Sequence, residues 1–207
     1  MSNYKTLDSW SLKAKKEGYP ARSVYKLQEI DEKFNLFTRK RSHDKIFRVL
    51  DLGAAPGSWS LFMLRKMQKN IFLAACDLSD LSTEYGKEYF NSQNVFFLKG
   101  DMENSENYAA LCERGPFNLV VSDAAPATSG NRLLDSSGSL CLAETSLRYA
   151  EQSLEKGGSW VTKIFQGEET ADFLKKIKPL FDKTQTFKPK ACRANSFEMY
   201  IIGLGKL

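Results

Sequence analysis

The sequence predicts an α/β protein in which a mainly parallel sheet is covered by helices, and three observations point to it. An apolar run from Ile46 to Leu52 ends in a glycine turn and is followed by the apolar spacing of a helix. Two further apolar runs, residues 71–76 and 95–98, follow as in successive strand–helix–strand units. The length of 207 residues suffices for one domain with a six- or seven-stranded sheet.

An amphipathic helix is expected before the first strand, because apolar residues recur there at steps of three and four. Lys26 and Arg22 are four residues apart, which would place them on one face of this helix. A lysine on a helix is usually exposed to solvent, so the pattern alone does not indicate a catalytic role for Lys26. The apolar residues are Val24, Leu27, Ile30 and Phe34.

The only histidine, His43, falls in a charged segment, residues 39–45, that is expected to form a loop. Such a loop is a poor place for a general base, so acid–base chemistry must fall to Lys, Asp, Glu or Tyr. Ser-His and Cys-His nucleophilic catalysis are disfavoured. The four cysteines are widely separated and form no C-x-x-C pair, so neither a zinc site nor a disulfide framework is suggested.

The turn after the first strand could hold a small polar ligand. Gly53 lets the chain turn, Ala54 and Ala55 keep the turn low, and Gly57 would let a ligand approach the backbone at the start of the next helix. The alternative is an ordinary strand-to-helix turn. A dinucleotide fingerprint is not matched, because Ala55 stands where the second glycine belongs and Pro56 removes an amide. A pyrophosphate would be poorly bound, which disfavours a dehydrogenase.

Acidic residues follow the ends of three predicted strands. Asp77 stands where a carboxylate would bind two ribose hydroxyls, and Asp101 could accept a hydrogen bond from an adenine amine. Asp123 follows the run 117–122 in the same way. S-adenosylmethionine fits this arrangement, because it carries adenine, ribose, an amino-acid tail and a sulfonium cation that acidic residues tolerate.

Two charged residues interrupt apolar strands in the C-terminal half. Lys163 lies within the run 159–165, and Glu198 lies within 197–203. A buried lysine needs a reason, although an edge position with the amine turned outward is the alternative. Residues 81–91 read as a weak helix or long loop, and 128–132 lie in a long loop. Further helices are expected at about 59–67, 103–112, 140–154 and 170–181, followed by a basic segment at 183–193.

Charge is unevenly distributed along the chain. The net charge is +6 over residues 1–48, −7 over 49–173 and +6 over 174–207. Basic segments around a nucleoside-binding core suit a polyanion such as RNA, although solvated surface charge or an acidic protein partner would give the same pattern. No apolar signal core or membrane-spanning run is apparent, so we expect a soluble, cytoplasmic protein.

From Arg22 to Gly203 the sequence resembles the FtsJ/RrmJ family of RNA ribose 2′-O-methyltransferases. The order and spacing of several segments together carry the resemblance. It implies a Rossmann-like methyltransferase fold, a seven-stranded mixed sheet with its last strand antiparallel and helices on both faces. Residues 1–207 would form a single S-adenosylmethionine-dependent domain with a basic N-terminal helical extension, about 1–45. The segments are Lys26-Leu27, Asp-Leu-Gly-Ala-Ala-Pro-Gly-Ser-Trp-Ser (51–60), Ser122–Pro126, Ser129-Gly130, Lys163–Gly167 and Ser196–Tyr200.

The resemblance also implies a set of site residues. A Lys-Asp-Lys-Glu tetrad would transfer the methyl group, and its members would be Lys26, Asp123, Lys163 and Glu198. The glycine turn would contact the cofactor, together with one carboxylate at each of three strand ends. The implied cofactor-binding residues are Gly53, Ala54, Pro56, Gly57, Trp59, Asp77, Asp101 and Asp123.

The chemistry of the tetrad leaves the role of one lysine open. A ribose 2′-hydroxyl is a weak nucleophile and must lose its proton as the new bond forms. Lys163 could bind the hydroxyl oxygen and stabilise developing negative charge, or it could accept the proton. No metal is required for the transfer. Two residues depart from the family pattern without touching the tetrad: Ser58 stands where a third glycine is common, and Cys192 where a hydroxyl residue is frequent.

The expected acceptor is a uridine of large-subunit ribosomal RNA, because the extra domains of larger relatives are absent, and the chain is expected to be a monomer. The alternatives are a tRNA or cap 2′-O-methyltransferase and a non-catalytic RNA-binding ribosome assembly factor. An enzyme that methylates a base amine is a further rival. The motif at Asp123 lacks the aromatic residue that such enzymes stack on a base.

Overall fold

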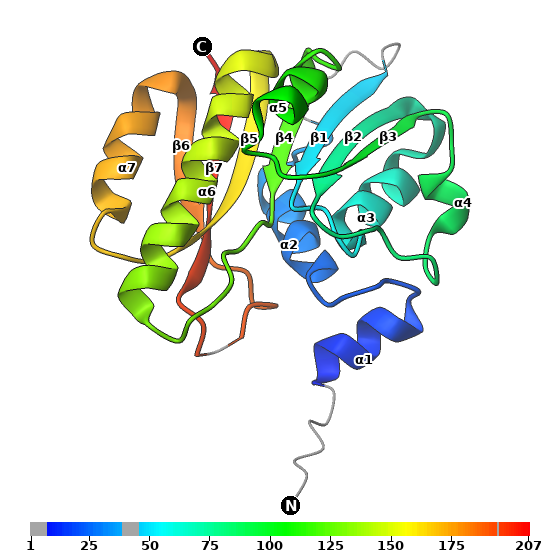
Figure 1. The fold of residues 1–207 in the computed structure, drawn as a ribbon, viewed down its shortest axis with the longest axis horizontal. Helices are drawn as coiled ribbons and strands as arrows, with labels where there is room; N and C mark the ends of the chain where they lie inside the picture. The colour runs from blue at the N-terminus through cyan, green and yellow to red at the C-terminus, as the bar shows by residue number, and fades with distance from the viewer. Residues whose placement is uncertain (1–7, 39–45, 194) are drawn as a thin grey trace, which may run out of the picture.

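The computed structural model describes residues 8–38, 46–193 and 195–207, and its centre is a seven-stranded sheet (Figure 1). The strands lie in the order β3-β2-β1-β4-β5-β7-β6. Only β7 runs against its neighbours, so the predicted mixed sheet with an antiparallel last strand is confirmed. The strands are β1 (Phe47–Leu52), β2 (Ile71–Asp77), β3 (Val95–Lys99), β4 (Phe117–Ser122), β5 (Leu154–Phe165), β6 (Phe181–Phe187) and β7 (Glu198–Lys206).

Helices cover both faces of the sheet, as expected. Helices α2 and α3 pack on one face, while α5, α6 and α7 pack on the other (Figure 1). None of the helices among the described residues is long and apolar enough to cross a membrane. The helices are α1 (Ser9–Lys16), α2 (Val24–Phe34), α3 (Ser58–Met67), α4 (Lys87–Phe90), α5 (Ser105–Cys112), α6 (Arg132–Ser153) and α7 (Thr170–Ile177), with 3₁₀ turns η1 (Gln68–Asn70) and η2 (Lys178–Leu180).

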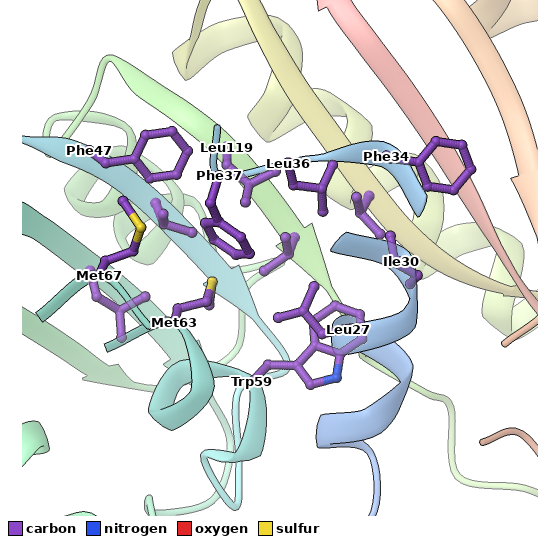
Figure 2. Close-up of a cluster of buried hydrophobic side chains, with 14 of the residues drawn as sticks. Leu27, Ile30, Phe34, Leu36, Phe37, Phe47, Trp59, Met63, Met67 and Leu119 are labelled. Atoms are coloured by element: carbon purple, nitrogen blue, oxygen red, sulfur yellow. The ribbon is translucent and has the colours of Figure 1, made fainter. Parts of the chain in front are cut away.

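The apolar face of α2 anchors that helix to the sheet. Leu27 and Ile30 are fully buried against Met63 of α3 and Leu119 of β4 (Figure 2). Burying a side chain of this size contributes about 1.5–3 kcal/mol. Because Lys26 precedes Leu27 on this anchored helix, its position at the sheet is fixed by packing.

The opposite face is closed by an aromatic stack. Trp160 of β5 lies parallel to Phe181 at the start of β6, with ring centroids 5.9 Å apart. The Trp160 indole N–H donates to the Ser146 hydroxyl of α6 at 2.8 Å. The stack and the hydrogen bond together fix α6 over β5, the strand that carries Lys163.

Several elements differ from those predicted by the sequence. The helix expected over 170–181 ends earlier, and residues 181–187 form the edge strand β6 instead of the start of a basic segment. Its residues are mostly polar, which is typical of an edge strand with one solvated face. Helix α6 begins at Arg132, inside the predicted loop, because Asn131 accepts hydrogen bonds from the amides of Leu133 and Leu134 and caps it.

Smaller differences concern the remaining segments. Helix α1 lies within the helical extension expected over about 1–45, although the sequence did not delimit it as a separate helix, and of residues 81–91 only 87–90 are helical. Strand β5 begins at Leu154, five residues before the predicted run 159–165, and includes Gly157 and Gly158. Arg22 precedes α2 and does not share its helical face with Lys26. The predicted loop 39–45, with His43, lies outside the described residues.

Candidate active site

The site lies where the strand order reverses, between β1 and β4, at the carboxyl ends of both strands. Gly53 has a φ of 71°, and a Cβ there would lie 2.6 Å from the Ala124 backbone. The turns after β1 and β4 can therefore meet only because residue 53 has no side chain. Gly57 also has a positive φ, but a Cβ there would meet the Phe90 ring at 2.6 Å. Gly57 thus allows close packing against Phe90 on the side where a Cβ would lie.

A cavity of about 320 Å³ opens at this reversal point. Four of the predicted cofactor residues line it: Gly53, Asp77, Asp101 and Asp123. The three carboxylates make the cavity acidic, which suits a cationic ligand and disfavours a phosphate. Its other lining residues are Ala55, Cys76, Leu78, Gly100, Met102, Ala124, Ala125 and Leu142, which the sequence did not single out as ligand contacts.

Backbone amides orient two of these carboxylates. Asp77 accepts hydrogen bonds from the amides of Ala55 at 2.9 Å and Ser79 at 2.8 Å. Asp101 accepts one from the Glu103 amide at 2.8 Å. A carboxylate offers about four lone-pair directions, so both side chains keep acceptor capacity for a ligand in the cavity.

The other predicted cofactor residues do not line the cavity: Ala54, Pro56, Gly57 and Trp59. Trp59 is buried in the core instead, where its indole N–H donates to the Ser23 carbonyl at 2.8 Å. Figure 2 shows its ring close to Leu27. The Trp59 ring also lies 5.7 Å from that of Tyr200. Its side chain therefore positions α2 and β7, the elements that carry Lys26 and Glu198.

Asp51 is a fully buried carboxyl group at the end of β1. Its Oδ2 atom accepts a hydrogen bond from Ser60 at 2.6 Å, and its Oδ1 atom has no partner among the described residues. Burial raises the pKa of Asp51 to about 7, against the lowering effect of the Ser60 bond, and the charges of Asp123 and Asp77 raise it further. Asp51 is thus sensitive to positive charge near the carboxylates of the cavity.

The structure brings together the four residues of the predicted tetrad. The Lys163 Nζ atom lies 3.2 Å from Asp123 Oδ1 and donates to the Asp123 backbone carbonyl at 2.6 Å. The Lys26 Nζ atom lies 2.5 Å from Glu198 Oε1 and 4.0 Å from Asp123 Oδ1. Lys163 is only 7% exposed, so the alternative of an amine turned outward is excluded.

Opposite charges keep Asp123 and Lys26 ionised. Burial would raise the pKa of Asp123, but the ammonium groups of Lys163 and Lys26 outweigh it and hold that pKa below its usual value. Burial would lower the pKa of Lys26, but Asp123 and Glu198 outweigh it and raise that pKa. The site therefore keeps fixed charges around the space beside Lys163.

Tyr200 is a member of the site to which the sequence assigned no role. Its hydroxyl donates to Asp123 at 2.7 Å and lies 3.2 Å from Glu198 Oε1. Burial, followed by these two carboxylates, raises its pKa well above the usual value, so it stays a neutral donor. Its position two residues after Glu198 could have revealed this role, because alternate residues of a strand face the same side.

A second cavity, of about 560 Å³, opens on the other side of the tetrad. Lys26 and Glu198 line it, whereas Asp123 lines the first cavity. Arg22 is a lining residue as well, and its guanidinium donates to the Asp8 carboxylate and the Ala191 carbonyl. The remaining lining residues are Ala21, Ser23, Thr128, Asp135, Phe165, Arg193, Asn195, Ser196 and Phe197.

The two cavities and the tetrad suit a transfer between two bound molecules. A donor in the acidic cavity would contact Asp123, and an acceptor in the second would contact Lys26 and Glu198. Asp123 lies beside both Lys26 and Lys163, so the tetrad connects the two cavities. The described residues contain no group of three or more His, Cys, Asp and Glu that could hold a metal ion.

Comparison with known proteins shows a whole-chain relationship. Residues 19–206 match the model of the FtsJ-like methyltransferase family. "Ribosomal RNA large subunit methyltransferase E" of Treponema denticola is 45% identical over 203 residues, covering 98% of this chain and 96% of the relative. The protein of the same name from Nitratidesulfovibrio vulgaris is 43% identical over 200 residues, covering 96% and 94%.

Solved structures share the fold. A ribosomal RNA methyltransferase from Plasmodium falciparum, described as putative, superposes with a TM-score of 0.73 at 24% identity, covering 91% of this chain and 99% of that one. A putative rRNA methylase from Clostridium thermocellum gives a TM-score of 0.59 at 18% identity, covering 87% and 97%. These likenesses confirm the Rossmann-like methyltransferase architecture.

Proposed function

Because the chain belongs to the FtsJ-like methyltransferase family, we propose that it transfers a methyl group from S-adenosylmethionine to a ribose 2′-hydroxyl of RNA. The proposed acceptor is a uridine of large-subunit ribosomal RNA, in keeping with the names of the bacterial relatives. The observation that carries the proposal is the tetrad of Lys26, Asp123, Lys163 and Glu198 between two cavities.

The residues of the first cavity fit the cofactor. Asp77 would accept hydrogen bonds from the ribose hydroxyls, Asp101 from the adenine amine, and Asp123 would face the methionyl ammonium. Bound there, S-adenosylmethionine supplies a methyl group on a sulfonium that loses its charge on transfer.

Lys163 is proposed as the group that removes the hydroxyl proton. In its neutral form the amine would donate its two N–H groups to the Asp123 carboxylate and carbonyl, leaving the lone pair for the 2′-hydroxyl. Asp123 is a poorer base, because its pKa lies below the usual value of a carboxyl group. The proton moves from the 2′-hydroxyl to Lys163 as the oxygen–methyl bond forms, and it is then released to water.

The other residues of the site orient this amine. Asp123 fixes Lys163, and the Tyr200 hydroxyl fixes Asp123. Lys26, paired with Glu198, supplies a positive charge that would stabilise the negative charge developing on the acceptor oxygen. Lys26 and Glu198 line the second cavity and would contact the acceptor ribose.

The basic segments outside the site are proposed to bind the RNA. Residues 1–207 would act as one methyltransferase domain, with the basic N-terminal extension, about 1–45, contributing to the RNA surface. We further propose that the enzyme acts as a monomer in the cytoplasm, where it meets ribosomal RNA.

The proposal is tested by product analysis. The protein is incubated with methyl-labelled S-adenosylmethionine and with ribosomal RNA from cells that lack it, and the RNA is digested to nucleosides. We expect the label in 2′-O-methyluridine. Label on a base nitrogen, or no transfer to any RNA, would contradict the proposal.

A further inference from the structure

We propose that Phe197 and Arg132 form a clamp that holds the base of the acceptor nucleotide between an aromatic ring and a guanidinium plane. The inference rests on the proposed function, because it assigns a ligand to the second cavity. Phe197 lies directly before Glu198 in the chain, and both residues line that cavity.

The Phe197 ring is held in place by a neighbouring aromatic side chain. The Phe165 ring meets it in an edge-to-face arrangement, with centroids 4.9 Å apart and planes at 61°. Phe165 is itself buried, and its backbone amide donates to the Ser139 hydroxyl of α6 at 2.9 Å. Phe197 is therefore held in position from one side without depending on Arg132.

The guanidinium of Arg132 lies over the Phe197 ring, with its central carbon 5.4 Å from the ring centroid. Aromatic rings and arginine guanidinium groups both stack on nucleobases in RNA-binding proteins. A base between two such planes needs about 7 Å, twice the 3.4 Å spacing of stacked bases. Arg132 is exposed at the first position of α6, so its side chain can move outward by the remaining distance.

The strand register brings this clamp to the reaction centre. Phe165 of β5 pairs directly with Glu198 of β7, and Phe165 follows Lys163 by two residues. A ribose held by Lys26 and Glu198 would therefore carry its base toward Phe197. Apart from Phe165, Phe197 and Ala21, polar and charged residues line the cavity. Because Phe165 is buried, the Phe197 ring is the apolar surface on which a base can stack there.

A structural role is the rival explanation. The Arg132–Phe197 contact would then only fasten the start of α6 to the segment before β7. That role would change stability, but it would not make binding depend on whether the RNA carries bases.

The test compares two ligands that differ only in their bases. Binding of fluorescent oligouridine RNA and of an abasic ribose–phosphate chain of equal length is measured for the full-length protein and four variants. The variants are Phe197→Leu, Phe197→Tyr, Arg132→Gln and Arg132→Lys.

The wild-type protein should prefer the RNA with bases, and Phe197→Leu should weaken its binding about 10- to 100-fold while leaving the abasic chain unaffected. Phe197→Tyr should keep the preference, because the ring is retained. Arg132→Gln should reduce the preference more than Arg132→Lys does, because lysine keeps the positive charge and glutamine does not. Neither variant should match the wild type, because neither side chain is both planar and charged.

Equal losses on both ligands, or an unchanged preference in Phe197→Leu and Arg132→Gln, would overturn the clamp. The experiment does not require methyl transfer, so its failure can be separated from failure of the proposed function. For protein that does transfer methyl groups, Phe197→Leu should raise KM for RNA more than it lowers kcat, at an unchanged Kd for S-adenosylmethionine.

Discussion

The Nζ atom of Lys26 lies 2.5 Å from the Oε1 atom of Glu198, so an ion pair joins helix α2 to the last strand of the sheet. Both side chains are largely buried, with 12% and 13% of their surfaces exposed. Two segments from opposite ends of the chain thus fix each other at the reaction centre.

Breaking this pair on one side should destabilise the protein. Lys26→Met leaves Glu198 buried without its partner, and we expect a loss of roughly 3 kcal/mol in the free energy of unfolding. The double variant with Glu198→Gln should lose less than the sum of the two single variants, measured by urea denaturation. Lys13→Met, which breaks an exposed pair with Glu17, is the matched control and should cost under about 1 kcal/mol. Additive losses would contradict the coupling.

The raised pKa of Asp51 predicts a stability that falls as the pH rises. The folded protein holds this proton up to a pKa of about 7, whereas the unfolded chain releases it near 3.8. Stability should therefore decline between about pH 4 and pH 7 and level off above. Asp51→Asn keeps an acceptor for Ser60 and should show a smaller decline in Tm over this window. Asp172→Asn, at an exposed position, should follow the wild-type curve. Parallel curves for Asp51→Asn and wild type would contradict the assignment.

Removal of the Tyr200 hydroxyl should raise the pKa of Asp123. The hydroxyl donates to Asp123 and lowers its pKa, so Tyr200→Phe should move the NMR titration of the Asp123 carboxyl to higher pH. Loss of a hydrogen bond to a charged group should also lower kcat about tenfold or more. Tyr25→Phe, which removes a hydroxyl bonded to Glu17, should leave the titration of Asp123 unchanged. An unshifted Asp123 titration in Tyr200→Phe would show that Asp123 does not depend on this bond.

Lys206 should matter for stability and not for chemistry. Its ammonium donates to the carbonyls of Ala150, Glu151 and Leu154 at the end of α6, at 3.0, 2.5 and 2.8 Å. Lys206→Met should lower the free energy of unfolding by about 1–3 kcal/mol, because helix-end carbonyls lose their donors. The kcat of the folded enzyme should stay at the wild-type value. Lys175→Met, in an exposed pair on α7, is the control for simple loss of charge.

Much of the site could be predicted from the sequence because its residues violate local patterns. Lys163 and Glu198 interrupt apolar strands, and Asp77 and Asp123 directly follow strands. A charged residue inside or directly after a predicted apolar strand indicates either that the strand was predicted wrongly or that the residue belongs to a functional site. The parallel core could be predicted as well, because short apolar runs alternate along the chain with segments that have the apolar spacing of a helix.

Other features depend on contacts between distant segments, which no local pattern reveals. Trp59 matches a cofactor motif, but its indole is buried against Ser23 and Tyr200, and the motif cannot show which way a ring turns. Among the described strands, β6 pairs only with β7, and it keeps a polar face, so its pattern resembles a loop. The Phe197–Arg132 contact joins the residue before β7 to the first residue of α6, and only the fold brings these two positions together.

The central claim is that the Lys163 amine takes the proton of the acceptor hydroxyl. The most direct test is the rate of methyl transfer to RNA by Lys163→Arg and Lys163→Met, with S-adenosylmethionine binding measured in parallel. Arginine keeps the positive charge but cannot act as a base in a protein. Both variants should bind the cofactor normally and lose about 100- to 10,000-fold in kcat. A Lys163→Arg enzyme that transfers methyl groups within tenfold of the wild-type rate would contradict the account.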